Sequence, residues 1–380
     1  MLSAAVPTAA AGTPASGAQP RLDAAHWLEH YCVDRLTQYT KLCMASGLSP
    51  ALKAAAATYA SRAGTGTRSQ PNVRTYPTPT KSLPIDIKNS PDGSPWFSET
   101  ANTMGRVDNR TKVVTEYRLP LEAGTPYAVS GGPGNYMWFT SLVLSQYGNK
   151  IGRIDVTTHE VQVWEIPTPY SYPADLKTGP DGGIWFTETR GNKISRFDPV
   201  TFKFEEFDVG IPGALPQDIA IVDGGVWYSD QAANVIQRID PYTHKIDTFP
   251  YPTPNMAVLD IDPGTPGVEG LNVDPNTHTV WFFGMAGNRV GYINTLTHEL
   301  KDFAVPSLNA IPFCGAAGPD DAIYWSEPGV NKYGRFDMKT SVVTEIPIPT
   351  PGAWPVDVTK NTGSVYNALL GANAIAEIIP

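Results

Sequence analysis

Cysteine, charge and long apolar runs are all scarce in this chain of 380 residues. Three cysteines are too few for a disulfide framework. No run of about 18 apolar residues occurs, so the sequence predicts no membrane-spanning helix. The net charge is −9 and basic runs are absent, which argues against nucleic acid as a partner. With 41% apolar residues, the chain is expected to form one large globular body with a small appendage.

A sevenfold internal repeat is the strongest pattern that is present. Each copy has a Pro-led apolar strand, a Gly/Asp turn, and strands resembling Trp-Phe-Thr-Glu, Asn-Lys-Ile-Gly-Arg and Thr-Glu-Tyr. Residues 172–196 hold the clearest copy of the first three strands, and copies return about every 42 to 54 residues. The aromatic residues of the second strand are Trp96, Trp138, Trp185, Trp227, Trp281, Tyr324 and Tyr366. Four short strands per repeat predict β-propeller blades, which bury their faces only by closing into a ring.

The seventh copy is one strand short at its C-terminal side. Residues 73–79 (Val-Arg-Thr-Tyr-Pro-Thr-Pro) match outer strands such as 343–347 (Val-Thr-Glu-Ile-Pro). We therefore expect a strand near the N-terminus to complete the seventh blade and remove an exposed sheet edge. The predicted fold is an all-β, seven-bladed β-propeller that spans residues 71–380.

The residues before the repeats have a different composition. Residues 1–20 are rich in Ala, Pro, Thr and Gly and are expected to be disordered. They lack the basic start and apolar core of a signal peptide. Residues 21–66 are expected to form a helical extension, with Asp23 as the first cap. The single glycosylation sequon, at Asn109, is weak support for secretion.

Candidate site residues are sought at one mouth of the central channel, where loops enter the innermost strands and leave the second strands. The residues that follow the inner-strand Pro in each copy are assigned as Ile85, Tyr127, Ala174, Gln217, Val268, Phe313 and Val356. Two loops on this side, residues 142–147 and 254–267, are unusually apolar. They favour an apolar ligand or a lid, and packing on the helical extension is the alternative.

Residues that do not recur in the repeat are the better site candidates, because ring architecture does not explain them. The residues predicted to be catalytic are Tyr127, Gln217 and Trp354. Those predicted to contact substrate are Tyr170, Tyr172, Phe313, Leu142, Leu144, Tyr147 and Met256. For each of them a packing role is the alternative.

Recurring carboxyl groups fall into two sets. The first set follows the inner-strand Pro by two residues: Asp86, Asp175, Asp218 and Asp357, with Glu269 as a rough equivalent. These carboxylates are predicted to accept backbone N–H groups at strand starts, although such a ring could also bind a cation. The second set ends the second strands: Glu99, Glu188, Asp230 and Glu327. These are predicted to pair with cations of the next strand, such as Lys193 and Lys332.

The Gly-Pro-Asp-Gly, Trp-Phe-Thr-Glu and Asn-Lys-Ile-Gly-Arg elements resemble the virginiamycin B lyase family over residues 71–380. The resemblance implies a magnesium ion and a catalytic His that follows the inner-strand Pro, fourteen residues before a metal-binding Glu. Here Glu188 and Glu327 hold the Glu position, but Ala174 and Phe313 stand where the His is expected. The general base of the lyase reaction is therefore missing, and we predict no metal and no cofactor.

A looser resemblance connects the chain with fungal propeller enzymes that catalyse hetero-Diels–Alder coupling in tropolonic sesquiterpenoid biosynthesis. It implies a cofactor-free cyclase that joins a quinone methide to a hydrophobic polyene, with apolar small molecules as the partners. Two alternatives stay open. One is a metal-dependent lyase or lactonase that uses carboxylates in place of the His; the other is a non-catalytic propeller that binds a ligand or a protein.

Overall fold

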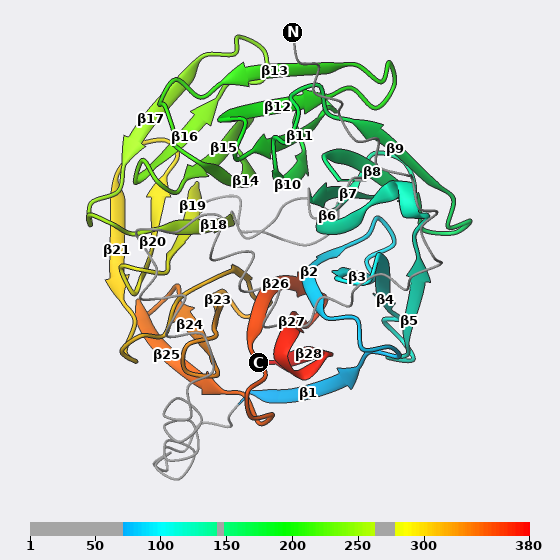
Figure 1. Cartoon of the computed structure of the whole chain (residues 1–380). Helices are drawn as coiled ribbons and strands as arrows, with labels where there is room; N and C mark the ends of the chain where they lie inside the picture. Colours follow the sequence, from blue (N-terminus) through cyan, green and yellow to red (C-terminus); the bar gives the residue numbers. More distant parts are fainter. Residues whose placement is uncertain (1–70, 143–147, 263–277) are drawn as a thin grey trace, which may run out of the picture.

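A computed structural model describes residues 71–142, 148–262 and 278–380. These residues form seven four-stranded antiparallel sheets arranged as a ring around a central channel (Figure 1). The predicted all-β, seven-bladed propeller is confirmed. The predicted disordered segment 1–20 and helical extension 21–66 lie outside the described residues.

The first four blades follow one another in sequence. Blade 1 contains β2 (Pro84–Asn89), β3 (Pro95–Glu99), β4 (Thr103–Val107) and β5 (Val114–Arg118). Blade 2 contains β6 (Thr125–Gly132), β7 (Tyr136–Leu142), β8 (Lys150–Asp155) and β9 (Val161–Glu165). Blade 3 contains β10 (Pro173–Thr178), β11 (Ile184–Glu188), β12 (Lys193–Phe197) and β13 (Phe204–Asp208). Blade 4 contains β14 (Pro216–Val222), β15 (Gly225–Asp230), β16 (Val235–Ile239) and β17 (Ile246–Pro250).

The last three blades complete the ring. Blade 5 contains β18 (Val258–Asp262), β19 (Thr279–Gly284), β20 (Arg289–Asn294) and β21 (Leu300–Ala304). Blade 6 contains β22 (Gly315–Ala317), β23 (Ala322–Glu327), β24 (Lys332–Asp337) and β25 (Val342–Pro347). Blade 7 contains β26 (Pro355–Asn361), β27 (Ser364–Leu369), β28 (Ala374–Ile379) and β1 (Asn72–Pro77). Two 3-10 turns, Leu121–Ala123 and Leu370–Ala372, are the helical elements of the described residues.

The repeat motif fills the space between blades. The second-strand aromatics that recur from Trp96 to Tyr366 are at most 1% exposed. The Gly of the third strand lies opposite the Phe of the second strand, as in the pairs Phe97↔Gly105 and Phe139↔Gly152. A Cβ at Gly105 would lie 1.9 Å from the Phe97 ring. The glycine therefore leaves room for the aromatic ring, and close packing between the strands requires both residues of the motif.

Ring closure follows the predicted route. β1 pairs antiparallel with β28 from Asn72↔Ile379 to Pro77↔Ala374. The Tyr76 hydroxyl donates a hydrogen bond of 2.6 Å to the Glu377 carboxylate. Figure 1 shows β1 along the outside of β28, so that the N-terminal strand covers the edge of the last blade.

The predicted start of blade 5 is wrong. The strand was expected near Val268, but β18 begins at Val258, and Val268 and Glu269 lie outside the described residues. In this blade Val258 occupies the place of the usual Pro, so the sequence signal for the strand start is missing. The equivalent mouth residues are Leu259 and Asp260. Segment 254–267 is therefore not a mouth loop throughout, because part of it is β18.

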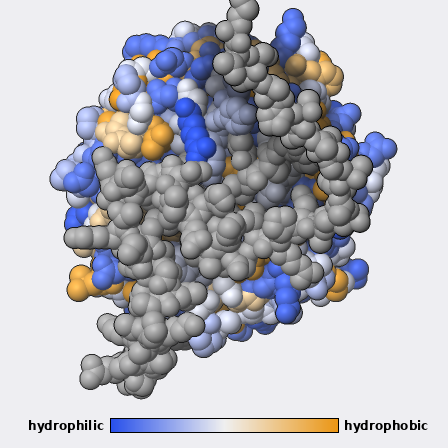
Figure 2. Space-filling view, in the orientation of Figure 1, coloured by the Kyte–Doolittle hydropathy of each residue, from blue (hydrophilic) through white to orange (hydrophobic). Residues whose placement is uncertain are grey.

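Within the described residues, no helix is long and apolar enough to cross a membrane. On the face in Figure 2 the described surface is mostly hydrophilic at its rim, with separate hydrophobic patches. The most exposed large apolar side chains are Leu308 at 85% and Val200 at 82%.

Removing β1 tests the closure. Deletion of residues 71–80 should expose the β28 edge and produce aggregated protein, because an unpaired strand edge is a template for other strands. Solubility and cooperative melting are the measurements, and Thr75→Ala, which changes one exposed side chain of β1, is the control. A soluble, cooperatively melting deletion variant would contradict the closure.

Candidate active site at the channel mouth

A β-bulge at the start of the inner strands shapes the mouth. In blade 1, Pro84 pairs with Glu99 but Ile87 already pairs with Phe97, so Ile85 and Asp86 lie opposite the single residue Ser98. The same shift occurs in blades 2, 3, 4, 5 and 7. A bulge re-aims the side chains of its two residues. As a result both residues of each bulge line the channel.

Hydroxyl groups of the second strands hold these bulges. The Asp86 N–H donates to Ser98 Oγ at 3.3 Å, and Ser98 Oγ donates to the Tyr127 carbonyl of the next blade at 2.5 Å. Thr187 Oγ1 binds the Gln217 carbonyl in the same way at 2.5 Å. The Ser/Thr in the Trp-Phe-Thr-Glu motif therefore fixes the mouth residue of the neighbouring blade.

The residues that follow the inner-strand Pro, or Val258 in blade 5, form a collar around the channel entrance. They are Ile85, Tyr127, Ala174, Gln217, Leu259, Phe313 and Val356, and all of them line one pocket. The cavity volume is about 70 Å³, within a wider hollow of about 580 Å³ that includes open solvent. Six of the seven collar side chains are apolar or aromatic, so this entrance can desolvate an apolar ligand.

One residue further along, carboxyl groups form the floor of the pocket. Asp357 accepts the Ile87 N–H at 2.8 Å, and Asp86 accepts the Val129 N–H at 2.5 Å. In each case the donor belongs to the next blade. Two further bonds follow the same rule, Ile219 N–H to Asp175 at 3.0 Å and Gly315 N–H to Asp260 at 2.8 Å. The prediction that these carboxylates bind backbone N–H groups is confirmed.

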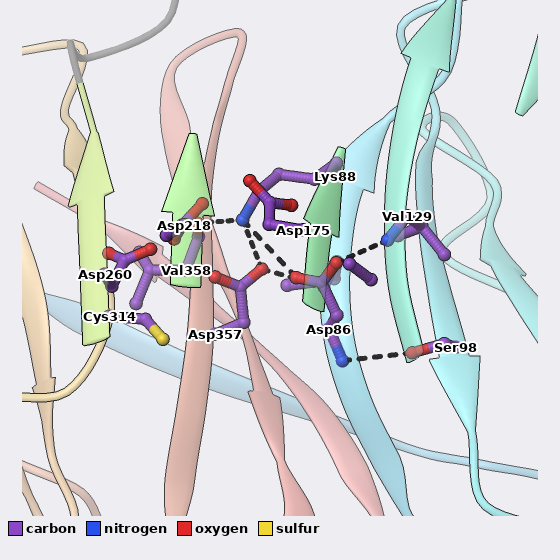
Figure 3. Close-up of polar contacts among 12 residues, drawn as sticks. Asp86, Lys88, Ser98, Val129, Asp175, Asp218, Asp260, Cys314, Asp357 and Val358 are labelled. Atoms are coloured by element: carbon purple, nitrogen blue, oxygen red, sulfur yellow. Dashed lines mark hydrogen bonds and ion pairs between the residues drawn. The ribbon is translucent and has the colours of Figure 1, made fainter. Parts of the chain in front are cut away.

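Two lysines on the channel wall pair with the floor carboxyls. Lys88 Nζ lies 2.5 Å from Asp357 and 3.5 Å from Asp86 (Figure 3). Lys177 Nζ lies 2.6 Å from Asp175 and 3.8 Å from Asp218. Both lysines were missed by sequence reasoning, although the shared spacing Asp-x-Lys in β2 and β10 was a usable signal. Residues two apart in a strand share a face, so that spacing places the cation beside the carboxylate.

The floor carboxyls titrate in opposite directions. Burial raises the pKa of Asp86 well above its ordinary value, and the Asp357 charge raises it further. Burial, Asp175 and Asp260 likewise raise the pKa of Asp218. For Asp175, burial is outweighed by Lys177, which lowers the pKa. Burial and the neighbouring charges therefore shift the pKa values of adjacent floor carboxyls in opposite directions.

A metal ion does not fit the donor groups at this mouth. The lyase pattern requires a His and a Glu, but the collar has Phe313 and Val356, and the fully buried Leu369 ends β27. Deeper in the channel, one atom each of Asp260, Cys314 and Asp357 lie within 4.8 Å of one another. Asp357 there already binds the Lys88 ammonium, and burial raises the pKa of the Cys314 thiol well above its usual range. We therefore assign no metal ligand to these groups.

Three predicted site residues lie together. Tyr127, Phe313 and Trp354 are half-buried and pack against the same apolar cluster, which includes Ile85 and Val356. Trp354 has a left-handed backbone with φ of 47°, directly before the inner strand β26. Tyr127 and Phe313 also line the pocket, whereas Trp354 does not.

The other predicted residues are more scattered. Gln217 lies in the collar, 4% exposed, and its amide donates to Gln231 at 3.5 Å. Tyr172 is buried beneath Arg190, and Tyr170 is 73% exposed outside the pocket lining. Leu142 is buried at the end of β7, and Met256 lies fully buried in the core between blades 4 and 5. Leu144 and Tyr147 lie outside the described residues.

The predicted pairing of the second carboxyl set is seen only in part. Glu188 lies opposite Lys193 and Glu327 lies opposite Lys332 in adjacent strands, and each lysine charge acts to lower the pKa of the carboxyl opposite it. Lys193 binds Glu206 at 2.7 Å and Lys332 binds Glu345 at 2.5 Å, both on the outer strands. Glu99 and Asp230 are fully buried, and their oxygens have no hydrogen-bond partner among the described residues. Their cation position is taken by Thr103 and Val235.

Burial changes the titration of this second set. It raises the pKa of Glu99 to about 9 and that of Asp230 to about 8. It also raises the pKa of Glu327 to about 8 and that of Glu188 to about 7. Glu99, Asp230 and Glu327 therefore favour the protonated form at neutral pH, whereas Glu188 titrates near neutral pH.

Asp230→Asn should reveal the cost of this burial. Because the folded-state pKa is raised, the stability that Asp230 contributes is present below the ordinary carboxyl pKa and is lost as the pH rises through about 8. Asn cannot ionise, so the variant should match the wild type near pH 4 and melt at a higher temperature near pH 9. The expected gain is about 1–3 kcal/mol.

Thermal melts across this pH range measure the effect. Glu206→Gln is the control of opposite sign, because hydrogen bonds to Lys193 and Thr168 overcome burial and lower the pKa of Glu206. Glu206→Gln should melt at a lower temperature than the wild type at high pH, and this difference should shrink as the pH falls. An Asp230→Asn variant that melts lower than wild type near pH 9 would contradict the assignment.

Two solved lyases share this architecture. A catalytically inactive His-to-Ala variant of virginiamycin B lyase from Staphylococcus aureus, with quinupristin, is 27% identical with a TM-score of 0.72. The match covers 82% of this chain and 100% of that one. A streptogramin B lyase is 26% identical with a TM-score of 0.72, over 83% of this chain and 99% of that chain. None of the curated proteins compared with the chain matches it.

The family model agrees with these structures. The model described as the virginiamycin B lyase family matches residues 16–268 and 267–380, which together exceed half of the chain. With its seven blades and repeat motifs, the chain belongs to the virginiamycin B lyase family.

Proposed function

We propose that this chain is a cofactor-free cyclase that couples apolar small molecules by a hetero-Diels–Alder reaction at the channel mouth. The observation that carries the proposal is the composition of the collar. At the positions where the lyase pattern has its His, the collar offers apolar and aromatic side chains and one amide, Gln217. Such a surface suits a reaction that depends on shape more than on removal of a proton.

The positions of the histidines in the described blades support the absence of a histidine base at the mouth. His159, His244 and His298 stack on outer-strand rings, with centroids 4.0 Å from Tyr117, 4.4 Å from Phe207 and 4.7 Å from Phe249. His278 binds Asp223 at 2.9 Å. None of these four residues lines the pocket.

A pericyclic coupling needs two partners held in a reactive pose and an electron-poor partner that is polarised. Fixing two reactants in one site converts a bimolecular step into an effectively unimolecular one. Tyr127 and Phe313 in the pocket lining supply stacking area for a flat conjugated partner, and Trp354 packs against the same apolar cluster. Hydrogen-bond donors at the collar and floor supply polarisation where charge develops. The expected partners are a quinone methide and a hydrophobic polyene.

Trp354→Ala tests the aromatic surface. Loss of the ring should slow coupling at least about tenfold, or roughly 1.4 kcal/mol of barrier. The assay is formation of the coupled product from a quinone methide generated in situ and humulene, followed by mass spectrometry. His244→Ala, which removes an aromatic contact at an outer hairpin, should leave turnover unchanged. If His244→Ala abolished coupling and Trp354→Ala did not, the reaction would take place elsewhere on the propeller.

Chelation separates this proposal from a metal-dependent lyase or lactonase, the function to which the family's solved members point. We expect coupling to survive treatment with EDTA, because the collar offers no ligand set for magnesium. Turnover and metal content before and after dialysis are the measurements. Complete loss of turnover that magnesium restores would return the chain to lyase chemistry.

A further inference from the structure

We propose that Gln217 donates a hydrogen bond to the oxygen of a flat, uncharged carbonyl ligand at the channel mouth, and that Ala174 leaves the space which this ligand occupies. The inference rests on the proposed function, since the ligand is taken as the electron-poor partner of the coupling, and it adds a binding site for the oxygen of that partner. Gln217 is the one amide of the collar, and it lines the pocket although its side chain is only 4% exposed.

The backbone at Gln217 is held in place from two blades. In blade 4 the residue lies in the bulge between Pro216 and Ile219, at the start of β14. From blade 3, Thr187 Oγ1 donates to the Gln217 carbonyl at 2.5 Å. The amide therefore projects from a fixed backbone at the channel entrance.

The Gln217 amide has few hydrogen bonds for a buried group. Its Nε2 donates to Gln231 Oε1 at 3.5 Å, a long contact, and the described residues give the amide no other partner. Asn367, fully buried in blade 7, is bonded at both ends: Nδ2 donates to the Asp357 carbonyl at 2.7 Å, and Oδ1 accepts the Tyr333 hydroxyl at 3.1 Å. A buried amide with too few partners costs free energy, and a ligand in the pocket supplies the missing partner.

At least one N–H group of Gln217 is available whichever way the amide is turned. Nε2 carries two N–H groups, and the contact with Gln231 uses one of them. If the amide is turned over, Oε1 faces Gln231 and both N–H groups are released. A donor for a ligand oxygen therefore remains in both arrangements.

Ala174 leaves an opening beside the amide. The collar runs from Tyr127 in blade 2 through Ala174 in blade 3 to Gln217 in blade 4, and all three residues line the pocket. Equivalent collar positions hold side chains as large as Leu259 and Phe313. Because the Ala174 side chain ends at Cβ, a flat ring can contact Tyr127 and extend its oxygen past Ala174 to the Gln217 amide.

The charges nearby limit the class of ligand. Asp175 and Asp218 directly follow Ala174 and Gln217 and line the same pocket, and Lys177 is already paired with Asp175 at 2.6 Å. Carboxylates disfavour an anionic ligand, whereas a neutral carbonyl oxygen needs only the amide donor. Tropone is a suitable probe, because it is a flat conjugated ketone without an ionisable proton. Cycloheptatriene has a seven-membered ring without the oxygen and serves as the control ligand.

Tropone binding and the infrared spectrum of bound tropone test the site. Gln217→Met keeps the length of the side chain and removes the donor, so it should weaken tropone binding about three- to tenfold, the effect of one neutral hydrogen bond. With the wild type, the C=O stretching band of bound tropone should lie at a lower frequency than in an apolar solvent, and Gln217→Met should abolish this shift. Cycloheptatriene should bind both proteins equally. Ala174→Leu should weaken the binding of both ligands, because the larger side chain fills the opening.

Gln237→Met is the matched control, since Gln237 is a buried Gln of the same blade that does not line the pocket. It should leave the tropone affinity and the C=O band unchanged. The proposal is wrong if the wild type does not bind tropone, if Gln217→Met binds it as tightly, or if the band of bound tropone keeps its apolar-solvent frequency. Should Gln217→Met fail to fold, the band with the wild type and the affinities of Ala174→Leu still decide.

The proposed function fails in a different way. If tropone binds with the expected dependence on Gln217 but no coupled product forms from quinone methide and humulene, the carbonyl site stands and the cyclase reaction falls. If coupling occurs at an unchanged rate in Gln217→Met, the cyclase stands and Gln217 is excluded as the residue that binds the oxygen of its partner.

Discussion

The ring depends on polar bonds that cross from each blade to the next at the channel. A bulge at the start of an inner strand leaves backbone groups without ladder partners, and buried groups of that kind are costly. The Ser98 hydroxyl binds the Tyr127 carbonyl of blade 2, and the Asp357 carboxylate binds the Ile87 N–H of blade 1. The second of these joins the last blade to the first, alongside the β1–β28 pairing. The same bonds position the collar, so the candidate site is a product of the ring's own hydrogen bonding.

Much of the fold could be predicted from sequence because its signals are local and repeated. The Trp of each second strand, the Gly opposite a Phe, and the outer-strand pattern at residues 73–79 each mark a strand, and together they specify seven blades. The error in blade 5 shows the limit of this reasoning. Val258 stands where the other inner strands have Pro. Without that Pro to mark its start, the strand cannot be distinguished by sequence from the apolar residues around it.

The candidate site was less accessible to sequence reasoning, because its residues meet only when the ring closes. The carboxylate bonds to backbone N–H groups were predictable, since their repetition indicates a structural role. The ion pair of Lys193 with Glu206, at 2.7 Å, was not predicted, because the sequence pattern pointed only to Glu188, which lies opposite Lys193 on its other side. Met256 was predicted to contact substrate from a loop, but its side chain packs in the core between blades 4 and 5. Lys88 and Lys177 were overlooked because a charged residue in a strand usually indicates a solvent-facing position.

The channel mouth shows how a ring of equivalent positions can change its chemistry. The collar and the floor are successive residues of the same bulges, so each blade contributes one group at each level. The collar side chains make none of these bonds, whereas the floor carboxylates accept N–H groups of the neighbouring blades. A collar residue can therefore differ from blade to blade without disturbing the bonds that hold the ring. Five carboxyls crowded around two lysines shift one another's pKa values, so a ring of structural groups becomes a set of perturbed carboxyls that faces an apolar entrance.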